Sequence, residues 1–144
     1  MRSTHQITRS AELESLAAFR ELIDIACAQH PAVDEQTSYY LKLAVEEACT
    51  NIITHGYAGM NPGSIILVLE LDPSKAVVTL TDFGRPFEPY EPPAPDVEAS
   101  LEEGITGGFG LFLIYQTMDS VGYQTAEDGN HLTFVKKLHT SQNG

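Results

Sequence analysis

The sequence predicts an α+β fold in a single domain over residues 1–144. Two segments with apolar residues at helical spacing come first, and two pairs of short segments rich in β-branched residues follow them. The length of 144 residues suits one core that folds without disulfides or a structural metal. Because 42% of the residues are hydrophobic and 19% are charged, the composition is that of a globular protein.

The N-terminal part is expected to hold a short strand and two helices. His5 to Thr8 has the character of a short edge strand. Ser10 can cap a helix from Ala11 to about Gln29, since a side-chain oxygen there accepts from free backbone amides. Asp34 can cap a second helix in the same way, and that helix is expected to run to about Thr54.

A hairpin and a long irregular segment are expected next. Ser64 to Leu71 and Ala76 to Thr81 are rich in Ile, Val, Leu and Thr, which favours two antiparallel strands. Asp72 to Lys75 supplies the turn between them. Arg85 to Gly104 is rich in proline and acidic residues and lies between two glycine segments, which predicts a mobile lid at about 85–110.

The chain is expected to close with a helix and a second antiparallel pair. Leu111 to Asp119 has the pattern of a helix. Val121 to Ala126 and Leu132 to Leu138 have the pattern of strands, with a turn at Asp128-Gly129-Asn130. The two helices, the hairpin and this closing pair together give the α+β order.

The charge and the cysteines exclude several classes of protein. A formal net charge of −12 repels phosphate backbones and anionic membranes, so no direct binding to nucleic acid or membrane is expected. The apolar runs are too short to span a membrane, and Met1 to Ser10 lacks the apolar stretch of a signal peptide, which predicts a cytoplasmic protein. Cys27 and Cys49 are expected to be buried thiols, and no zinc-ligand spacing is present.

The second predicted helix carries a polar stripe. Glu47, Asn51 and His55 are four residues apart, so a helix aligns them along one face. The amide oxygen of Asn51 suits Mg²⁺, and Glu47 can act as a general base toward a hydroxyl or water. The alternative for such a pair is an exposed polar surface without function. Glu46 lies four residues after Lys42 and is expected to form a surface ion pair with it.

Two glycine-containing segments complete the candidate site. Asp82 follows a predicted strand, where its carboxylate can accept from an exocyclic amine such as that of adenine, and Gly84 lets the backbone pass close to the base. Gly107 to Gly110 opens a helix, where backbone amides converge on an anion. Neither a P-loop nor a Rossmann glycine pattern is present. Each segment alone is also typical of an ordinary turn, but together they predict a magnesium nucleotide site.

In this order, the three segments resemble the histidine-kinase-like ATPase (GHKL) superfamily, and most closely the anti-sigma factor serine/threonine kinases of bacterial partner switching. Residues 44–57 are similar to the N box of that family, residues 82–87 to its adenine-binding box and residues 107–114 to its lid glycine box. The resemblance spans nearly the whole chain. It implies a Bergerat-type ATP-binding fold, which is a two-layer α/β sandwich with helices on one face of a mixed, mostly antiparallel sheet.

The resemblance also implies a role for individual residues and a set of partners. The cofactors implied are ATP and Mg²⁺. One implied partner is a small anti-anti-sigma (STAS-type) protein, which is phosphorylated on serine or threonine. The other is a sigma factor, which a homodimer of the chain binds. Leu16 and Phe19 suit a dimer face or the core equally. Carried over position by position, the implied roles are general base for Glu47, magnesium ligand for Asn51, adenine recognition for Asp82, close approach for Gly84, phosphate binding by the amides of Gly108, Gly110 and Leu111, and a position near the adenine for Thr133.

One departure from the family pattern keeps a second function open. Many relatives carry a basic residue just ahead of the lid glycines, whereas residues 102–106 here are acidic to neutral. Arg85 or a residue from a partner chain can supply the missing charge. The alternatives are a kinase, a nucleotide-gated module that sequesters a sigma factor or other regulator without catalysis, and an α/β interaction domain that binds no nucleotide.

Overall fold

A computed structural model describes residues 2–86 and 114–138 of the chain. These residues form an α+β fold, as the sequence predicts. The short helical piece that precedes β4 comprises residues 114–117. The other elements, in chain order, are β1 (Ser3–Ser10), a 3₁₀ turn (Leu13–Ser15), α1 (Leu16–Ala28), α2 (Glu35–Asn51), a π-helical turn (Ile52–Gly56), β2 (Ser64–Leu71), β3 (Lys75–Asp82), β4 (Ser120–Ala126) and β5 (Gly129–Lys137).

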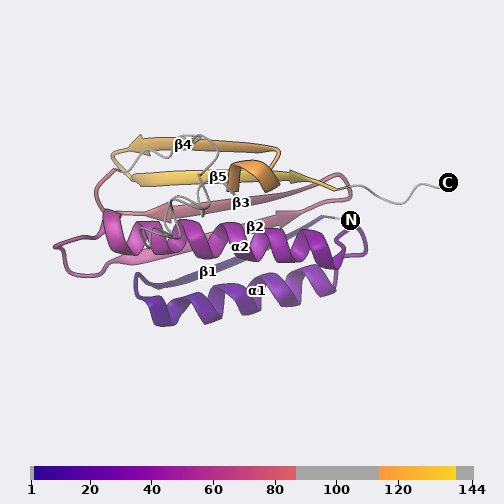
Figure 1. Ribbon diagram of the computed structural model, residues 1–144, viewed down its shortest axis with the longest axis horizontal. Helices are drawn as coiled ribbons and strands as arrows, with labels where there is room; N and C mark the ends of the chain where they lie inside the picture. Colours follow the sequence, from indigo (N-terminus) through magenta and orange to yellow (C-terminus); the bar gives the residue numbers. More distant parts are fainter. Residues whose placement is uncertain (1, 87–113, 139–144) are drawn as a thin grey trace, which may run out of the picture.

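The strands form one open sheet in the order β1-β2-β3-β5-β4. Each of the four pairings among the described strands is antiparallel, so the predicted antiparallel character of the sheet is confirmed and extends to every pair. β1 lies at one edge, where the sequence places a short strand. Figure 1 shows α1 and α2 side by side on one face of this sheet, which gives the two-layer arrangement.

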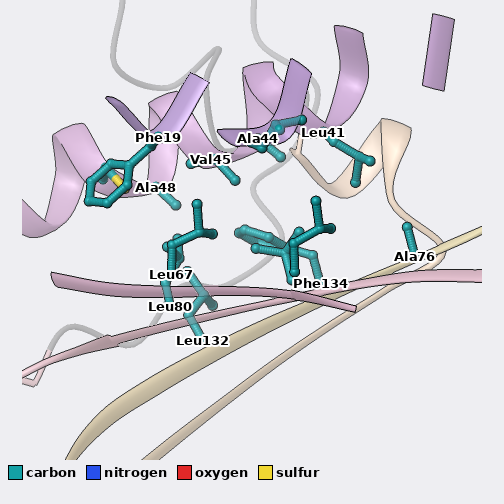
Figure 2. Packing of buried hydrophobic residues seen from close by; sticks show 14 of the residues in the cluster. Phe19, Leu41, Ala44, Val45, Ala48, Leu67, Ala76, Leu80, Leu132 and Phe134 are labelled. Carbon is teal, nitrogen blue, oxygen red and sulfur yellow. The ribbon is translucent and has the colours of Figure 1, made fainter. Parts of the chain in front are cut away.

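The core lies between the two helices and the sheet. Alternate residues of β2 and β3 are buried, because successive side chains of a strand point to opposite faces and only one face meets the helices. In Figure 2, Leu67, Leu80 and Leu132 of the sheet lie beneath Phe19 and Val45 of the helices. Full burial of a side chain of this size stabilises the fold by about 1.5–3 kcal/mol. This packed layer fixes α2 relative to β3.

The two predicted helix caps have different outcomes. Asp34 caps α2, since its Oδ1 accepts from the backbone N of Thr37 at 2.8 Å, and this prediction is confirmed. The prediction for Ser10 is wrong. Ser10 is the last residue of β1 and pairs with Ser64 of β2, so the strand ladder holds its backbone and α1 begins only at Leu16.

The turns of both hairpins are short. In the turn between β2 and β3, Asp72 Oδ1 accepts from Ser74 Oγ at 2.8 Å and from the backbone N of Ser74 at 2.7 Å, and these donors lower the pKa of Asp72. Between β4 and β5, Gly129 has a φ of 125° and pairs with Ala126. The predicted turn at 128–130 is therefore displaced, because Gly129 and Asn130 already belong to β5.

Two further predictions concern side chains of the helices. Cys27 and Cys49 are buried and free, as predicted. Glu46 does form an ion pair, but its partner is Arg20 of α1, whereas Lys42 pairs with Asp24 of α1 at 2.7 Å. The predicted pair within α2 is therefore wrong, since contacts between packed helices replace it.

Two observations on the described residues bear on the dimer and membrane predictions. Phe19 is 1% exposed and Leu16 packs against the core, so in this chain both residues serve core packing. Within residues 2–86 and 114–138, no helix is long and apolar enough to cross a membrane.

Candidate nucleotide-binding site

The polar stripe of α2 ends at a change of helix type. Glu47 and Asn51 lie one turn apart at the C-terminal end of α2, and both are partly buried. Beyond Asn51 the chain continues as a π-helical turn, closed by a hydrogen bond from the backbone N of Tyr57 to the oxygen of Ile52 at 3.0 Å. His55 lies in this turn and is exposed. Of the three stripe residues, Glu47 and Asn51 are therefore partly shielded from solvent and His55 is not.

Asp82 is the last residue of β3 and points toward the helix layer. It is 5% exposed and continues the buried set that includes Val78 and Leu80. Its Oδ1 accepts from the backbone N of Gly84 and from Nδ2 of Asn130, each at 3.0 Å. A buried carboxylate needs such donors, because removing its hydration without replacement costs several kcal/mol.

The loop after β3 packs directly on the π-helical turn. A Cβ at Gly84 would lie 2.5 Å from the oxygen of Gly56, closer than real Cβ atoms come. The next residue, Arg85, donates its backbone N to that same oxygen at 2.7 Å. The close contact at Gly84 is therefore with the backbone of Gly56, whereas the approach expected from the sequence is to a nucleotide base.

Tyr57 joins three segments around the site. Its hydroxyl donates to the oxygen of Ser64 and accepts from the backbone N of Phe83, both at 2.9 Å. Burial raises the pKa of Tyr57, and the charge of Asp82 adds to the effect. The hydroxyl therefore stays protonated and keeps the π-helical turn, the start of β2 and the end of β3 together.

A pocket lies where these segments meet. Asn51 from α2 and Asp82 from β3 both line it, so the structure brings together the two polar residues that the sequence selects. Arg85 is the basic residue of the lining. Among the described residues, the cavity volume is about 20 Å³. The apolar wall is formed by Ala48, Ile52, Ile114, Val121, Leu132 and Phe134, with Tyr115 and Tyr123 beside them.

Glu47 lies one helical turn before Asn51 and is not among the residues that line the pocket. Burial raises the pKa of Glu47 above its ordinary value, and the neighbouring charge of Glu46 raises it further. A carboxylate with a raised pKa is a stronger base, which suits proton abstraction near neutral pH.

The remaining predicted site residues divide into two groups. Gly108, Gly110 and Leu111, with most of the predicted lid, lie outside the described residues. Thr133 is described, but it pairs with Thr79 and its side chain lies on the face of β5 opposite to Asn130. The structure therefore does not bring Thr133 to Asp82, and this expectation is corrected because β5 alternates its side chains between faces.

Sequence reasoning missed three residues of the site, namely Gly56, Tyr57 and Asn130. Asn130 could not be found locally, because only the register of β3 with β5 places it opposite Asp82. Gly56 and Tyr57 follow the stripe directly, but their roles depend on the contacts with Gly84 and Phe83 that folding creates.

The residues around this pocket are of the chemical types that a site for a purine nucleotide uses. The apolar wall suits a flat ring, and Asp82 supplies an acceptor beside it. In the described part of the chain, no group of three His, Cys, Asp or Glu residues can hold a metal ion. The amide oxygen of Asn51 is of the ligand type that Mg²⁺ accepts, and Mg²⁺ usually takes only one or two protein ligands beside phosphate oxygens and water.

Comparison with known proteins finds the same type of domain. The family model of the histidine kinase-like ATPase domain matches residues 9–136. The serine/threonine-protein kinase BtrW of Bordetella bronchiseptica is 30% identical over 97 residues, 67% of this chain and 68% of that protein. The serine-protein kinase RsbW of Listeria innocua is 36% identical over 111 residues, covering 71% and 67%. The anti-sigma F factor of Halalkalibacterium halodurans is 27% identical over 138 residues, covering 95% and 93%.

Proposed function

The chain belongs to the histidine kinase-like ATPase domain family, and from this premise we propose that it is an ATP-dependent serine/threonine protein kinase and anti-sigma regulator that acts in partner switching. The observation that carries the proposal is the position of Asn51 and Asp82 in the lining of one apolar pocket. Relatives named as serine-protein kinases and as anti-sigma F factors support the activity and its setting.

In this proposal each part of the pocket binds a different part of the nucleotide. The apolar wall holds the purine, and Asp82 accepts from its exocyclic amine. Asn51 supplies an amide oxygen to Mg²⁺, which when bound neutralises charge on the phosphate oxygens. The backbone amides of Gly108, Gly110 and Leu111, outside the described residues, are the proposed phosphate contacts.

Glu47 is the proposed general base. Its position one turn from Asn51 lets it reach a hydroxyl brought close to the terminal phosphate, and its raised pKa strengthens it as a proton acceptor. A base of this kind typically contributes a factor of about 10²–10⁴ to the rate. The hydroxyl oxygen of the partner's serine or threonine attacks the γ-phosphorus of ATP while its proton passes to Glu47. The bond between the γ-phosphorus and the β,γ-bridging oxygen breaks, and ADP leaves.

The proposed partners are an anti-anti-sigma protein of the STAS type, which receives the phosphoryl group, and a sigma factor, which a homodimer of this chain binds. The net charge of −12 favours protein partners over nucleic acid or an anionic membrane. β1 is an edge strand, and Leu13 of the 3₁₀ turn and Ile25 of α1 are 56% and 51% exposed, which suits a contact between copies. Sedimentation that gives twice the chain mass of 15.7 kDa supports the dimer, and the mass of a single chain contradicts it.

The kinase proposal is tested by a pair of neighbouring substitutions. Full-length protein, Mg-ATP and a candidate anti-anti-sigma partner are mixed, and phosphoserine or phosphothreonine is measured. Glu47→Gln is expected to lower the transfer rate by about 10²–10⁴. Glu46→Gln removes an adjacent charge that pairs with Arg20 and should keep transfer at neutral pH. Undiminished transfer by the Glu47 variant removes it from the base role.

A second candidate function is a nucleotide-gated module that sequesters a sigma factor or another regulator without catalysis. The absence of a basic residue in the sequence 102–106 favours it. Arg85 offsets this observation, since it lines the pocket and brings a cation near the nucleotide. Tight Mg-ATP binding with no phosphoprotein product across several partners selects the module, and transfer that is lost in Arg85→Ala selects the kinase.

A further inference from the structure

We propose that Asn130 is a positioning residue that fixes the Asp82 carboxylate and thereby sets the preference of the pocket for adenine over purines with an oxygen at carbon 6. The inference rests on the proposed binding of ATP at this site. It concerns a residue that the family resemblance did not assign and that stands opposite Asp82 in the pairing of β3 with β5.

The hydrogen bonds around Asp82 are concentrated on one oxygen. Asn130 Nδ2 and the backbone N of Gly84 both donate to Oδ1 of Asp82 at 3.0 Å. Within residues 2–86 and 114–138, these two bonds hold the carboxylate from the side of β5 and of the loop. The second oxygen, Oδ2, is therefore the one that remains to accept from a ligand.

The orientation of the Asn130 amide follows from its two neighbours. Its Nδ2 also donates to the backbone oxygen of Gly84 at 3.0 Å. Both Asp82 Oδ1 and this oxygen are acceptors, so the amide must present its NH₂ group to them and cannot be reversed. Since Asn130 is 4% exposed and Asp82 5%, water does not compete readily for these bonds.

A carboxylate held at one oxygen discriminates between purines better than one that rotates. Adenine presents an N–H donor at carbon 6, which Oδ2 can accept, whereas hypoxanthine presents a carbonyl oxygen that the carboxylate repels. A site built around a fixed hydrogen bond rejects the analogue that lacks the donor. Without the amide of Asn130, Asp82 can turn and the distinction weakens.

The same pair of strands offers a matched control. In the adjacent pair of the same ladder, one residue before Asp82 and one residue after Asn130, Thr81 Oγ1 and His131 Nδ1 lie 2.9 Å apart on the outer face of the sheet. His131 Nε2 in turn lies 3.2 Å from Asp128 Oδ1. Thr81→Val removes this cross-strand bond without touching Asp82, so it measures the effect of weakening the strand pair alone.

The experiment measures binding of Mg-ATP and of Mg-inosine triphosphate to the full chain by calorimetry. Wild type is expected to prefer ATP. Asn130→Asp should lower ATP affinity by about tenfold to a hundredfold, because the amide donor is replaced by a carboxyl group that repels the Asp82 carboxylate, and should change inosine triphosphate binding much less. Asn130→Ser, whose hydroxyl keeps one donor, should give an intermediate ratio of affinities. Thr81→Val should keep the wild-type ratio.

Several outcomes overturn the inference. A folded Asn130→Asp or Asn130→Ser protein with the wild-type ratio overturns it, as does an equal fall of the ratio in Thr81→Val. Thermal unfolding establishes which variants fold. If Asn130→Asp does not fold, the test is made with Asn130→Ser. Wild type that binds ATP without preference overturns the inference alone. Wild type that binds neither nucleotide overturns the proposed function as well.

Discussion

Substitution of Gly84 by alanine tests the contact that joins the two halves of the pocket. An alanine Cβ would lie 2.5 Å from the oxygen and 2.7 Å from the carbonyl carbon of Gly56. Both neighbours are backbone atoms, so relief requires the loop after β3 to move away from the π-helical turn. That movement strains or breaks the hydrogen bond from the backbone N of Arg85 to the same oxygen, which is 2.7 Å long.

The expected cost combines these effects. Overpacking of this kind costs typically about 1–3 kcal/mol, and loss of one backbone hydrogen bond adds about 0.5–1.5 kcal/mol. We therefore expect the free energy of unfolding to fall by about 1.5–4.5 kcal/mol. Urea unfolding followed by circular dichroism measures this fall, seen as a lower midpoint with an unchanged slope.

Gly122 provides the matched control on β4. No atom lies within 4 Å of a Cβ built there, and alanine is favoured over glycine inside a strand by about 0.5–1 kcal/mol. Gly122→Ala should therefore leave the free energy of unfolding unchanged or raise it slightly. If Gly84→Ala unfolds at the same urea concentration as wild type, the contact with Gly56 does not limit the packing of the loop, and the reasoning fails.

Two further predictions concern the ionisation of groups near the site. Burial and the charge of Glu46 raise the pKa of Glu47, and a general base must be deprotonated to act. On acidification, the rate of phosphoryl transfer should therefore begin to fall at a pH above the ordinary pKa range of a glutamate. Glu46→Gln should move that acid limb to lower pH in a pH–rate profile, and an unmoved limb would argue against coupling of the two carboxylates. Burial raises the pKa of the Cys49 thiol, with a further contribution from the charge of Asp82, so Cys49 should stay neutral and resist alkylation until the protein unfolds. Rapid labelling of Cys49 in the native protein, located by mass spectrometry, would contradict its buried position.

The parts of the fold that sequence predicts well depend on local chemistry. The cap at Asp34 and the turn at Asp72 each require only a side-chain oxygen near free backbone amides, and both are present. The strand Ser64–Leu71 has the predicted bounds, because its buried and partly buried residues alternate along the whole segment. Ser10 shows the limit of such reasoning, since pairing with β2 decides its conformation.

The parts that sequence predicts poorly depend on contacts between distant segments. Lys42 lies four residues from Glu46 and could pair with it within α2. Both side chains instead form ion pairs with residues of α1, and a rule based on sequence spacing cannot anticipate contacts between helices. The sequence predicts that Asn51 and Asp82 share a site, and both residues line one pocket. Asn130, by contrast, gains its role only from the register of β5 with β3.

The side chains of β5 show why one residue of register decides the site. Asn130, Leu132 and Phe134 are buried on the helix side. Another residue of this strand faces the pocket only if it is separated from them by an even number of positions in the sequence. Thr133 fails this condition by a single position. An amide at 130 instead meets Asp82 directly, so the strand contributes a hydrogen-bond donor from the buried face.

The contact between Gly56 and Gly84 also explains how two short motifs act as one site. Asn51 lies in the turn of helix that leads to Gly56, and Asp82 lies two residues before Gly84. The backbone of Gly56 accepts from Arg85, so the end of the helix and the end of β3 move together. The distance between the proposed metal ligand and the proposed adenine acceptor is thus set by a backbone contact that tolerates no side chain. For this reason Gly84→Ala should weaken Mg-ATP binding as well as stability, whereas a purely stabilising role of the contact would leave the affinity of the folded variant unchanged.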